Sequence, residues 1–282
     1  MERPPISIII PCFNAAGFLP RAIDSVIQQG IAAVEIIIVD DASLDDSVVV
    51  AEGLARRHPG IVIIPQKVNA GPAAARNAGL AAATGRLVGF LDADDAYAPG
   101  AFARILERFA ASPRLAAVVV GIDWMEGDRD FHPVQAAAAT GSAPGNLLVR
   151  RSVALMIGGF PTDAVFRGRH AGEDVAFRTA LKNYFTIDYL DAKLYRHYLR
   201  PGCHFYRFLD RSRVDADGKL VFTQPAENVA GLLSGIAAHN GRLEARLRAI
   251  EFLKPEAMEN VLPRAAGRPG APQREVSAGP GS

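Results

Sequence analysis

The first half of the chain alternates short apolar runs with longer stretches in which apolar residues recur every three or four positions. Runs rich in Ile, Val and Leu predict buried strands at residues 7–10, 35–39, 61–64 and 87–91. Helical spacing predicts helices at residues 18–29, 45–58, 72–83 and 99–110. Strands that are apolar on both faces and alternate with helices predict a mostly parallel central sheet flanked by helices, in the α/β class.

The second half of the chain is less regular. We predict further strands at 116–120, 145–149, 185–190 and 193–199, and helices at 152–158 and from Glu173 onward. Residues 225–253 carry helical patterns that break near Gly235 and Asn240, and the uncharged stretch 132–149 is typical of loop and strand. Residues 263–282 contain no Leu, Ile or Phe, so we expect them to form a disordered tail.

Composition and charge exclude several classes of protein. The net charge of +1 over 282 residues predicts no general attraction to nucleic acid, and we expect no such partner. Cys12 and Cys203 are the only cysteines and do not form a zinc-binding pair, which favours a reducing cytoplasmic setting over a disulfide scaffold. We find no signal peptide and no run of about 18 apolar residues that would predict a spanning helix.

The clearest chemical feature follows the strand at 87–91, which ends in Asp92-Ala93-Asp94-Asp95. Alternate side chains of an extended segment share a face, so Asp92 and Asp94 point one way and Asp95 the other. Two carboxylates on one face repel each other unless a cation or a proton lies between them. A divalent cation with oxygen ligands is the expected partner, and the capping of a helix that opens at Pro99 is the alternative.

Two other polar residues, Asn14 and Asp41, also come just after predicted strands. Ligands of parallel sheets collect at the carboxyl ends of the strands. We therefore expect Asn14 and Asp41 to lie in one crevice with Asp92 and Asp94.

Six motifs in a fixed order resemble glycosyltransferase family 2, which has the GT-A fold and inverts the anomeric centre. They are Pro11-Cys12-Phe13-Asn14, Asp40 to Asp45, Asn69-Ala70-Gly71 with Ala75 to Gly79, Leu91 to Asp95, Gly158-Gly159-Phe160 and Gly172 to Phe177. The resemblance covers roughly residues 5–200 and implies transfer of a sugar from a nucleotide diphosphate donor with a bound Mg or Mn ion.

For the donor, the resemblance implies that Asp94 binds the metal directly and that Asp92 orients the ribose or a metal-bound water. Asp41 would accept the imide N–H of uracil, with capping of the 45–58 helix as its alternative role. Pro11 and Phe13 would flank the base, close to Asn14; an ordinary core position is the alternative for Phe13.

The loop that leads into the helix at 72–83 would serve the phosphates. Gly71 stands at the start of that helix, where backbone N–H groups favour anions, and Arg76 could add charge-assisted hydrogen bonds. Arg76 could instead form a structural ion pair with Asp92 or Asp41.

For catalysis, the resemblance implies that Asp174 is the base that removes the acceptor proton, with Glu173 helping to bind the acceptor. Capping of a helix is the alternative role for Asp174. His197 stands where some related enzymes carry a histidine that reaches the metal or the pyrophosphate, and a structural role is its alternative. Arg200 and Arg196 could clamp the pyrophosphate or lie at the surface.

These expectations describe a metal-dependent enzyme that moves one hexosyl or N-acetylhexosaminyl group from a UDP-sugar to an acceptor hydroxyl in glycan, polysaccharide or glycoconjugate biosynthesis. Trp124, the one tryptophan, is not part of a Gln-x-x-Arg-Trp box, which argues against processive synthesis. A sugar nucleotidyltransferase and a non-catalytic nucleotide-sugar-binding protein are the alternatives.

The expected organisation is a single domain over residues 1–262. Residues 1–95 form the nucleotide-binding half, 96–215 the acceptor and catalytic half, and 216–262 a helical extension. The sequence leaves the acceptor, the donor sugar and a homodimer open. Peripheral contact with the inner face of a membrane through Phe205, Phe208 and Leu209 is a further alternative, against which core packing is favoured.

Overall fold

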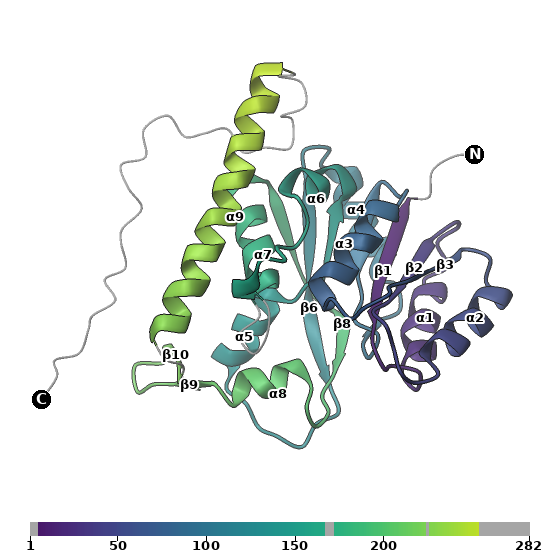
Figure 1. Cartoon of the computed structure of the whole chain (residues 1–282), viewed down its shortest axis with the longest axis horizontal. Helices are drawn as coiled ribbons and strands as arrows, with labels where there is room; N and C mark the ends of the chain where they lie inside the picture. The colour runs from purple at the N-terminus through teal and green to yellow at the C-terminus, as the bar shows by residue number, and fades with distance from the viewer. Residues whose placement is uncertain (1–4, 167–171, 224–225, 254–282) are drawn as a thin grey trace, which may run out of the picture.

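The computed structural model describes residues 5–166, 172–223 and 226–253 (Figure 1). Within these residues, eight strands form one sheet in the order β3-β2-β1-β4-β7-β6-β8-β5. The strands are β1 (Ile6–Cys12), β2 (Glu35–Asp40), β3 (Ile61–Pro65), β4 (Leu87–Phe90), β5 (Ala96–Tyr97), β6 (Ala117–Met125), β7 (Leu147–Arg150) and β8 (Ile187–Tyr198).

The sheet is mostly parallel, as the sequence predicts. Strands β1 to β4 run in the same direction, and β6 is parallel to β8. Strand β7 is antiparallel to both β4 and β6, and the short β5 is antiparallel to β8. The predicted α/β class and GT-A architecture are confirmed.

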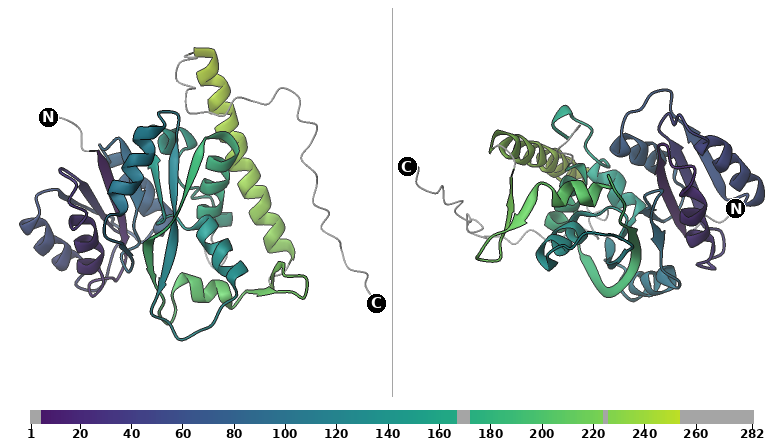
Figure 2. Two further views of the ribbon diagram at one scale, coloured as in Figure 1. Left: turned by 180° about the vertical axis from the view of Figure 1, so that it is seen from behind. Right: turned by 90° about the horizontal axis from the view of Figure 1, so that it is seen from below.

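Helices cover both faces of the sheet (Figures 1 and 2). Alternate residues of β1 face opposite layers: Ile8 and Ile10 pack with α1, α2 and α4, whereas Ile9 packs with α3, α6, α7 and α9. The helices are α1 (Leu19–Ile27), α2 (Ser47–Arg57), α3 (Pro72–Ala82), α4 (Ala101–Ala111), α5 (Pro133–Ser142), α6 (Arg151–Ile157), α7 (Glu173–Tyr184), α8 (His204–Leu209) and α9 (Ala226–Leu253).

Two predicted breaks are absent, and the prediction was wrong at both places. The region 185–199 was expected to form two strands, but Ile187–Tyr198 form the single strand β8, whose register with β6 shifts on both sides of Gly121. A Cβ atom on Gly121 would lie 3.1 Å from the carbonyl oxygen of Ala192, so glycine lets the two strands approach closely.

Helix α9 is continuous through Gly235 and Asn240, where a break was expected. A Cβ atom on Gly235 would lie 2.7 Å from a methyl group of Val165. The glycine therefore allows close packing of α9 against the 3-10 turn η1 (Ala164–Phe166) and does not end the helix.

The stretch 132–149 also differs from the prediction, because residues Pro133–Ser142 form helix α5. His132 caps this helix: its side chain accepts a hydrogen bond from Val134, and Gln135 bonds back to the His132 backbone. Alanine-rich helices lack a strong apolar period, so the sequence pattern of this stretch predicts loop and strand and not a helix. The hairpin of β9 (Ser212–Val214) and β10 (Leu220–Phe222) was likewise not predicted.

A small cluster below the sheet contains Leu199, Phe205, Tyr206 and Leu209, with Trp124 packed against it. Phe205 and Leu209 are buried, which supports the core-packing interpretation of these residues over membrane contact. No helix among the described residues is long and apolar enough to cross a membrane. The tail at 263–282 lies outside the described residues.

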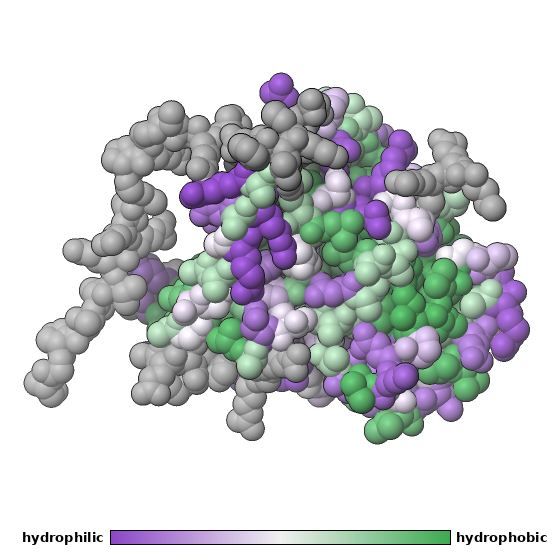
Figure 3. Space-filling model, turned by 45° about the horizontal axis from the view of Figure 1, so that its top comes forward, coloured by the Kyte–Doolittle hydropathy of each residue, from purple (hydrophilic) through white to green (hydrophobic). Residues whose placement is uncertain are grey.

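Helix α9 packs against α6 and α7 through Leu243 and Leu247, and His239 of the same helix is also buried. The outer surface of α9 carries arginines among small apolar side chains, and Figure 3 shows hydrophilic residues along this helix. Arg242 is paired with Asp163 at 2.9 Å.

We expect the α9 interface to weaken as pH falls. Burial, together with the charges of Arg242 and Arg246, lowers the pKa of His239 to about 4. An unfolded histidine takes up a proton near pH 6.5, so stability is full above that pH and is lost progressively down to about pH 4. The loss should approach about 3 kcal/mol. Urea unfolding between pH 7.5 and 4.5 measures it.

Carboxylates with lowered pKa values also contribute to acid sensitivity, so His239→Gln is the control. This variant should retain the carboxylate contribution and show a smaller loss of stability between pH 7 and pH 5. An unchanged pH dependence in His239→Gln would contradict the assignment of the effect to His239.

Candidate active site

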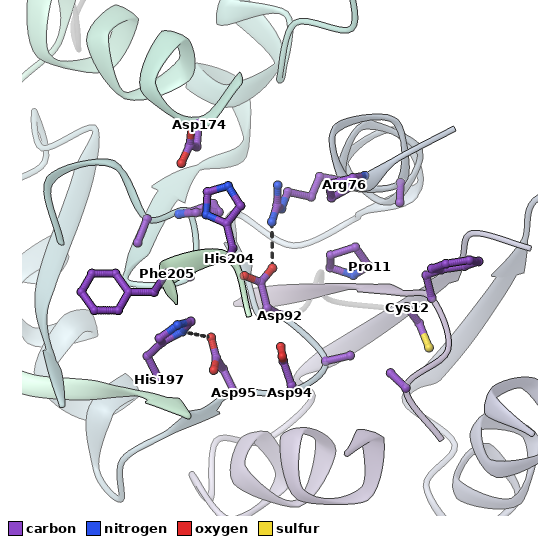
Figure 4. A pocket seen from close by; sticks show the side chains of 18 of the residues that line it. Pro11, Cys12, Arg76, Asp92, Asp94, Asp95, Asp174, His197, His204 and Phe205 are labelled. Atoms are coloured by element: carbon purple, nitrogen blue, oxygen red, sulfur yellow. Dashed lines mark hydrogen bonds and ion pairs between the residues drawn. The ribbon is translucent and has the colours of Figure 1, made fainter. Parts of the chain in front are cut away.

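A cavity of about 480 Å³ opens at the carboxyl edge of the sheet. Its walls come from loops that follow β1, β2 and β4 and from helices α3, α5, α7 and α8. Figure 4 shows side chains from these elements pointing toward one space. The sequence-predicted residues that line it are Pro11, Phe13, Asn14, Asp41, Gly71, Arg76, Asp92, Asp94, Glu173, Asp174 and His197.

Asp41 anchors the loop that leads into α3. Its two carboxylate oxygens accept hydrogen bonds from the backbone N–H groups of Ala70 and Gly71, both at 2.8 Å. Gly71 has a φ of +87°, a conformation that suits glycine and turns the chain into Pro72, the first residue of α3. Asp41 thus shapes the start of α3 as well as facing the cavity, and it does not cap α2.

Asp40 and Asn14 lie beside this loop. Asp40 accepts a hydrogen bond from the Ser43 N–H through one oxygen, while its other oxygen is buried without a hydrogen bond to the described residues. Asn14 accepts from the Leu44 N–H at 2.7 Å and joins the loops after β1 and β2. The Phe13 side chain is 48% exposed at the cavity, so it is not an ordinary core aromatic.

Arg76 joins the two halves of the cavity from inside α3. It is buried and forms an ion pair of 2.8 Å with Asp92 and a weaker contact of 3.5 Å with Glu173 (Figure 4 shows the Asp92 pair). Burial alone would raise the pKa of Asp92, but the charge and hydrogen bond of Arg76 lower it. The structural ion pair is therefore present, and the guanidinium still lies in the cavity wall.

Asp94 also has an arginine partner. Arg200, from the loop between β8 and α8, donates to one oxygen of Asp94 from Nε at 3.0 Å and Nη2 at 2.5 Å. The Arg200 guanidinium stacks over Phe18 at 4.7 Å, and Arg21 bonds to the Asp94 backbone carbonyl. Cationic groups thus neutralise both acids that the sequence assigns to a metal.

Residues 92–95 form a turn in which the Asp95 N–H donates to the Asp92 carbonyl, so the extended segment that the prediction of alternating acids assumed is absent. Asp95 is completely buried. It accepts a hydrogen bond from Tyr195 Oη at 2.6 Å and lies 2.7 Å from His197 Nδ1. Burial disfavours the charged imidazole, but its hydrogen bonds to Asp95 and Cys203 and the charge of Asp95 outweigh this and raise the pKa of His197 to about 10. A carboxylate bonded to one ring nitrogen also orients the imidazole of many metal ligands, and His197 lines the cavity, so this geometry fits both the structural role and the ligand role.

His204 is a second histidine of the cavity wall. It is the first residue of α8 and lies between Asp92 and Asp174 in the cavity (Figure 4). Trp124, Phe205 and Arg207 are further cavity residues that the sequence did not assign to the site. The i, i+3, i+4 spacing of residues 204, 207 and 208 was the available signal.

Asp174 stands in the first turn of α7 and points into the cavity (Figure 4). Its Oδ1 accepts a hydrogen bond from the Val175 N–H at 2.7 Å, and it has no arginine partner among the described residues. Glu173 beside it is buried, and burial together with the Asp174 charge raises the pKa of Glu173. Asp174 thus faces the cavity without a cationic partner among the described residues, whereas Glu173 is held by Arg76.

The paired glycines before Phe160 pack against protein and do not line the cavity. A Cβ atom on Gly159 would lie 2.2 Å from Asn77 Oδ1, and Asn77 bonds to both backbone groups of Phe160. These contacts hold the α6–η1 segment against α3.

The described residues contain no group of three or more His, Cys, Asp or Glu that could hold a metal ion by themselves. The oxygen donors that face the cavity, Asp92 and Asp94, match the preference of Mg²⁺ and Mn²⁺ for hard ligands. Magnesium ions are often held by one or two carboxylates and completed by substrate phosphates, and these two residues fit that pattern.

The family model for glycosyl transferase family 2 matches residues 7–171, which is more than half of the chain. The chain belongs to glycosyltransferase family 2. An uncharacterised glycosyltransferase of Nostoc is 42% identical over 123 residues, which cover 44% of this chain and 38% of the relative. The minor teichoic acid biosynthesis protein GgaA of Bacillus subtilis is 36% identical over 121 residues, covering 41% and 27%. The chain therefore matches well under half the length of these relatives.

Solved structures confirm the GT-A fold of this family 2 chain. S. aureus TarS 1-349 in complex with UDP-GlcNAc superposes with a TM-score of 0.62 at 19% identity and covers 88% of this chain and 71% of that one. The mannosyltransferase PcManGT of Pyrobaculum calidifontis, in complex with GDP-Man and Mn²⁺, gives a TM-score of 0.57 at 21% identity and covers 91% and 78%.

The two histidines of this site should respond differently to substitution. His197→Ala leaves the buried Asp95 without its charged partner, and we expect the free energy of unfolding to fall by about 3–5 kcal/mol. His204→Ala removes an exposed side chain and should change stability by less than about 0.5 kcal/mol. Urea unfolding at pH 7 checks both values, and equal losses in the two variants would contradict the structural role of His197.

Proposed function

We propose that this family 2 chain is a metal-dependent, inverting and non-processive glycosyltransferase that moves one sugar from a UDP-sugar to an acceptor hydroxyl in cell-surface polysaccharide or glycoconjugate biosynthesis. The observation that carries the proposal is the meeting of Asp92, Asp94 and Asp174 in one cavity (Figure 4). Two of these acids have cationic partners, and the third is available as a base.

The nucleotide would bind at the end of the cavity formed by the loops after β1 and β2, called the nucleotide end below. Phe13 and Pro11 line that end, where Phe13 offers an exposed ring to the base. Asp41 is the proposed acceptor for uracil N3–H, because each of its oxygens has a second lone pair beyond the backbone hydrogen bonds. The unpaired buried oxygen of Asp40 is a second acceptor at the same strand end.

The diphosphate would lie between Arg76, Gly71 and the acids Asp92 and Asp94. A divalent cation at these acids would neutralise charge on the leaving nucleoside diphosphate as a Lewis acid. Arg200 would exchange Asp94 for a phosphate oxygen, because a guanidinium binds either anion in the same way. His204, between Asp92 and Asp174, joins His197 as a proposed histidine for the phosphates or the metal.

Asp174 is the proposed general base. It would take the proton of the acceptor hydroxyl as the oxygen attacks the anomeric carbon from the face opposite the diphosphate, which inverts that carbon. Glu173, held by Arg76, would position this end of α7 and contact the acceptor. UDP-GlcNAc in a structure of TarS and the role of GgaA in minor teichoic acid biosynthesis support a UDP-sugar and a cell-envelope product.

The first test is thermal unfolding with UDP, GDP, CDP and dTDP, each with and without Mn²⁺. A ligand at about 100 times its dissociation constant adds about 2.7 kcal/mol to the free energy of unfolding. We expect UDP with Mn²⁺ to raise the melting temperature by several degrees. Asp94→Ala should lose the metal-dependent part of the rise, whereas Asp215→Ala, on the β9–β10 turn, should retain it. If Mn²⁺ increases the UDP-induced rise of Asp94→Ala as much as that of the unsubstituted protein, Asp94 is excluded as the metal ligand.

Substitution of the base should separate binding from transfer. Asp174→Asn preserves size but removes the proton acceptor, so sugar transfer should fall about a hundred- to ten-thousandfold while UDP affinity stays unchanged. Transfer is measured as UDP release in the presence of acceptor. Asp188→Asn, which alters a surface ion pair of β8, is the control and should keep full transfer.

The two alternative functions predict other results. A sugar nucleotidyltransferase would release pyrophosphate from a nucleoside triphosphate and a sugar phosphate. A non-catalytic binder would bind UDP-sugar but would show no difference between Asp174→Asn and the unsubstituted chain.

A further inference from the structure

The end of the cavity opposite the nucleotide loops is built by β6, α5 and α8. Trp124 of β6 and Ala139 and Ser142 of α5 form one side. On the other side, α8 directs one face toward the cavity, because His204, Arg207 and Phe208 follow the i, i+3, i+4 spacing. Asp174 lies next to His204, so this end adjoins the proposed base (Figure 4).

The base of this end is aromatic and held in place by packing. The ring of Trp124 stacks on that of Phe205 with centroids 4.3 Å apart, and Phe131 meets both rings edge-on. Phe208 extends the stack beyond Phe205 at 5.9 Å. Such a surface can bind the apolar face of a sugar or polyol without rearrangement.

The acids near this aromatic base already have partners. Asp210 is paired with Arg129 at 2.8 Å, and Asp128 accepts a hydrogen bond from Tyr206 Oη at 2.8 Å. Arg207 is exposed at the cavity and makes no ion pair with any residue that the structure describes.

The surrounding segment is strongly basic although the whole chain is nearly neutral. Residues 196–213 contain five arginines and one acid, Asp210, in a protein with a net charge of +1. Two other arginines of the cavity, Arg76 and Arg200, contact Asp92 and Asp94 at the diphosphate end. Arg207 is therefore a positive charge beyond those that serve the proposed donor site.

We propose that Arg207 binds a phosphate group of the acceptor, so that the acceptor is a phosphate-bearing polyol or glycan whose hydroxyl lies at Asp174. The inference rests on the proposed function of the cavity and names the class of its second substrate. A planar guanidinium binds two phosphate oxygens at once, and the aromatic rings beside it bind the carbon skeleton next to the phosphate.

The test compares two probes that differ in charge, a synthetic trimer of glycerol 3-phosphate and uncharged triglycerol. Each is titrated by calorimetry into the full chain saturated with UDP and Mg²⁺. We expect the phosphate trimer to bind at least about tenfold more tightly than triglycerol. Arg207→Gln should weaken trimer binding about ten- to a hundredfold, and Arg207→Lys should restore part of it.

Arg213→Gln is the matched control, because Arg213 is an exposed arginine on the neighbouring strand β9 and does not line the cavity. It should bind the trimer like the unsubstituted chain. Equal losses in Arg207→Gln and Arg213→Gln would overturn the proposal in favour of a general basic surface. Equal binding of trimer and triglycerol by the unsubstituted chain would also overturn it.

Two further measurements distinguish an acceptor-binding role of Arg207 from a role in the donor site and from binding to a membrane surface. UDP affinity should be the same in Arg207→Gln and the unsubstituted chain, and a loss there would assign Arg207 to the donor site. Absence of UDP binding by the unsubstituted chain would overturn the proposed function itself. The last measurement tests binding of the chain to vesicles of phosphatidylglycerol. If the chain binds these vesicles only when Arg207 is present and does not bind the soluble trimer, Arg207 would be assigned to a membrane surface instead.

Discussion

The buried guanidinium of Arg76 is the interaction on which the site depends. It comes from α3 and contacts Asp92 after β4 and Glu173 at the start of α7, so one side chain joins three elements that are distant in the sequence. A charge buried this deeply is tolerated only with partners, and removing either acid would leave the guanidinium poorly compensated. The geometry between the proposed donor site and the proposed base is therefore fixed by the same ion pairs that stabilise the fold.

This arrangement also explains how so many acids can share one cavity. Asp92 and Asp94 are neutralised by Arg76 and Arg200, and Asp95 is neutralised by His197 behind them. Each acid thus has a cationic partner before any ligand arrives, which limits the repulsion that adjacent carboxylates would otherwise create. Arg200 differs from the other two cations because it is partly exposed and extends from a loop, so it can exchange partners at low cost.

The sequence predicted the residues whose position follows from strand ends, and it did not predict those whose position depends on distant packing. Asp41, Asp92 and Asp94 come directly after buried parallel strands, and such strands end at one edge of a sheet. His204 follows a turn after a long bulged strand, and only the packing of Phe205 and Leu209 against Trp124 directs it into the cavity. The same limitation applies to α5 and α9, because alanine and glycine carry weak signals when contacts with other elements decide the structure.

The two ends of the cavity differ in how they are built, and this difference bears on specificity. The nucleotide end is held by backbone hydrogen bonds to Asp41 and by the ion pair of Arg76, which leave little freedom in the loops. The opposite end rests on aromatic packing beneath a short helix, α8, whose exposed side chains can change without disturbing the sheet. If the proposed donor and acceptor ends are right, substitutions at positions such as 207 would alter the acceptor without affecting the donor, and this division would allow a common donor chemistry with variable acceptors.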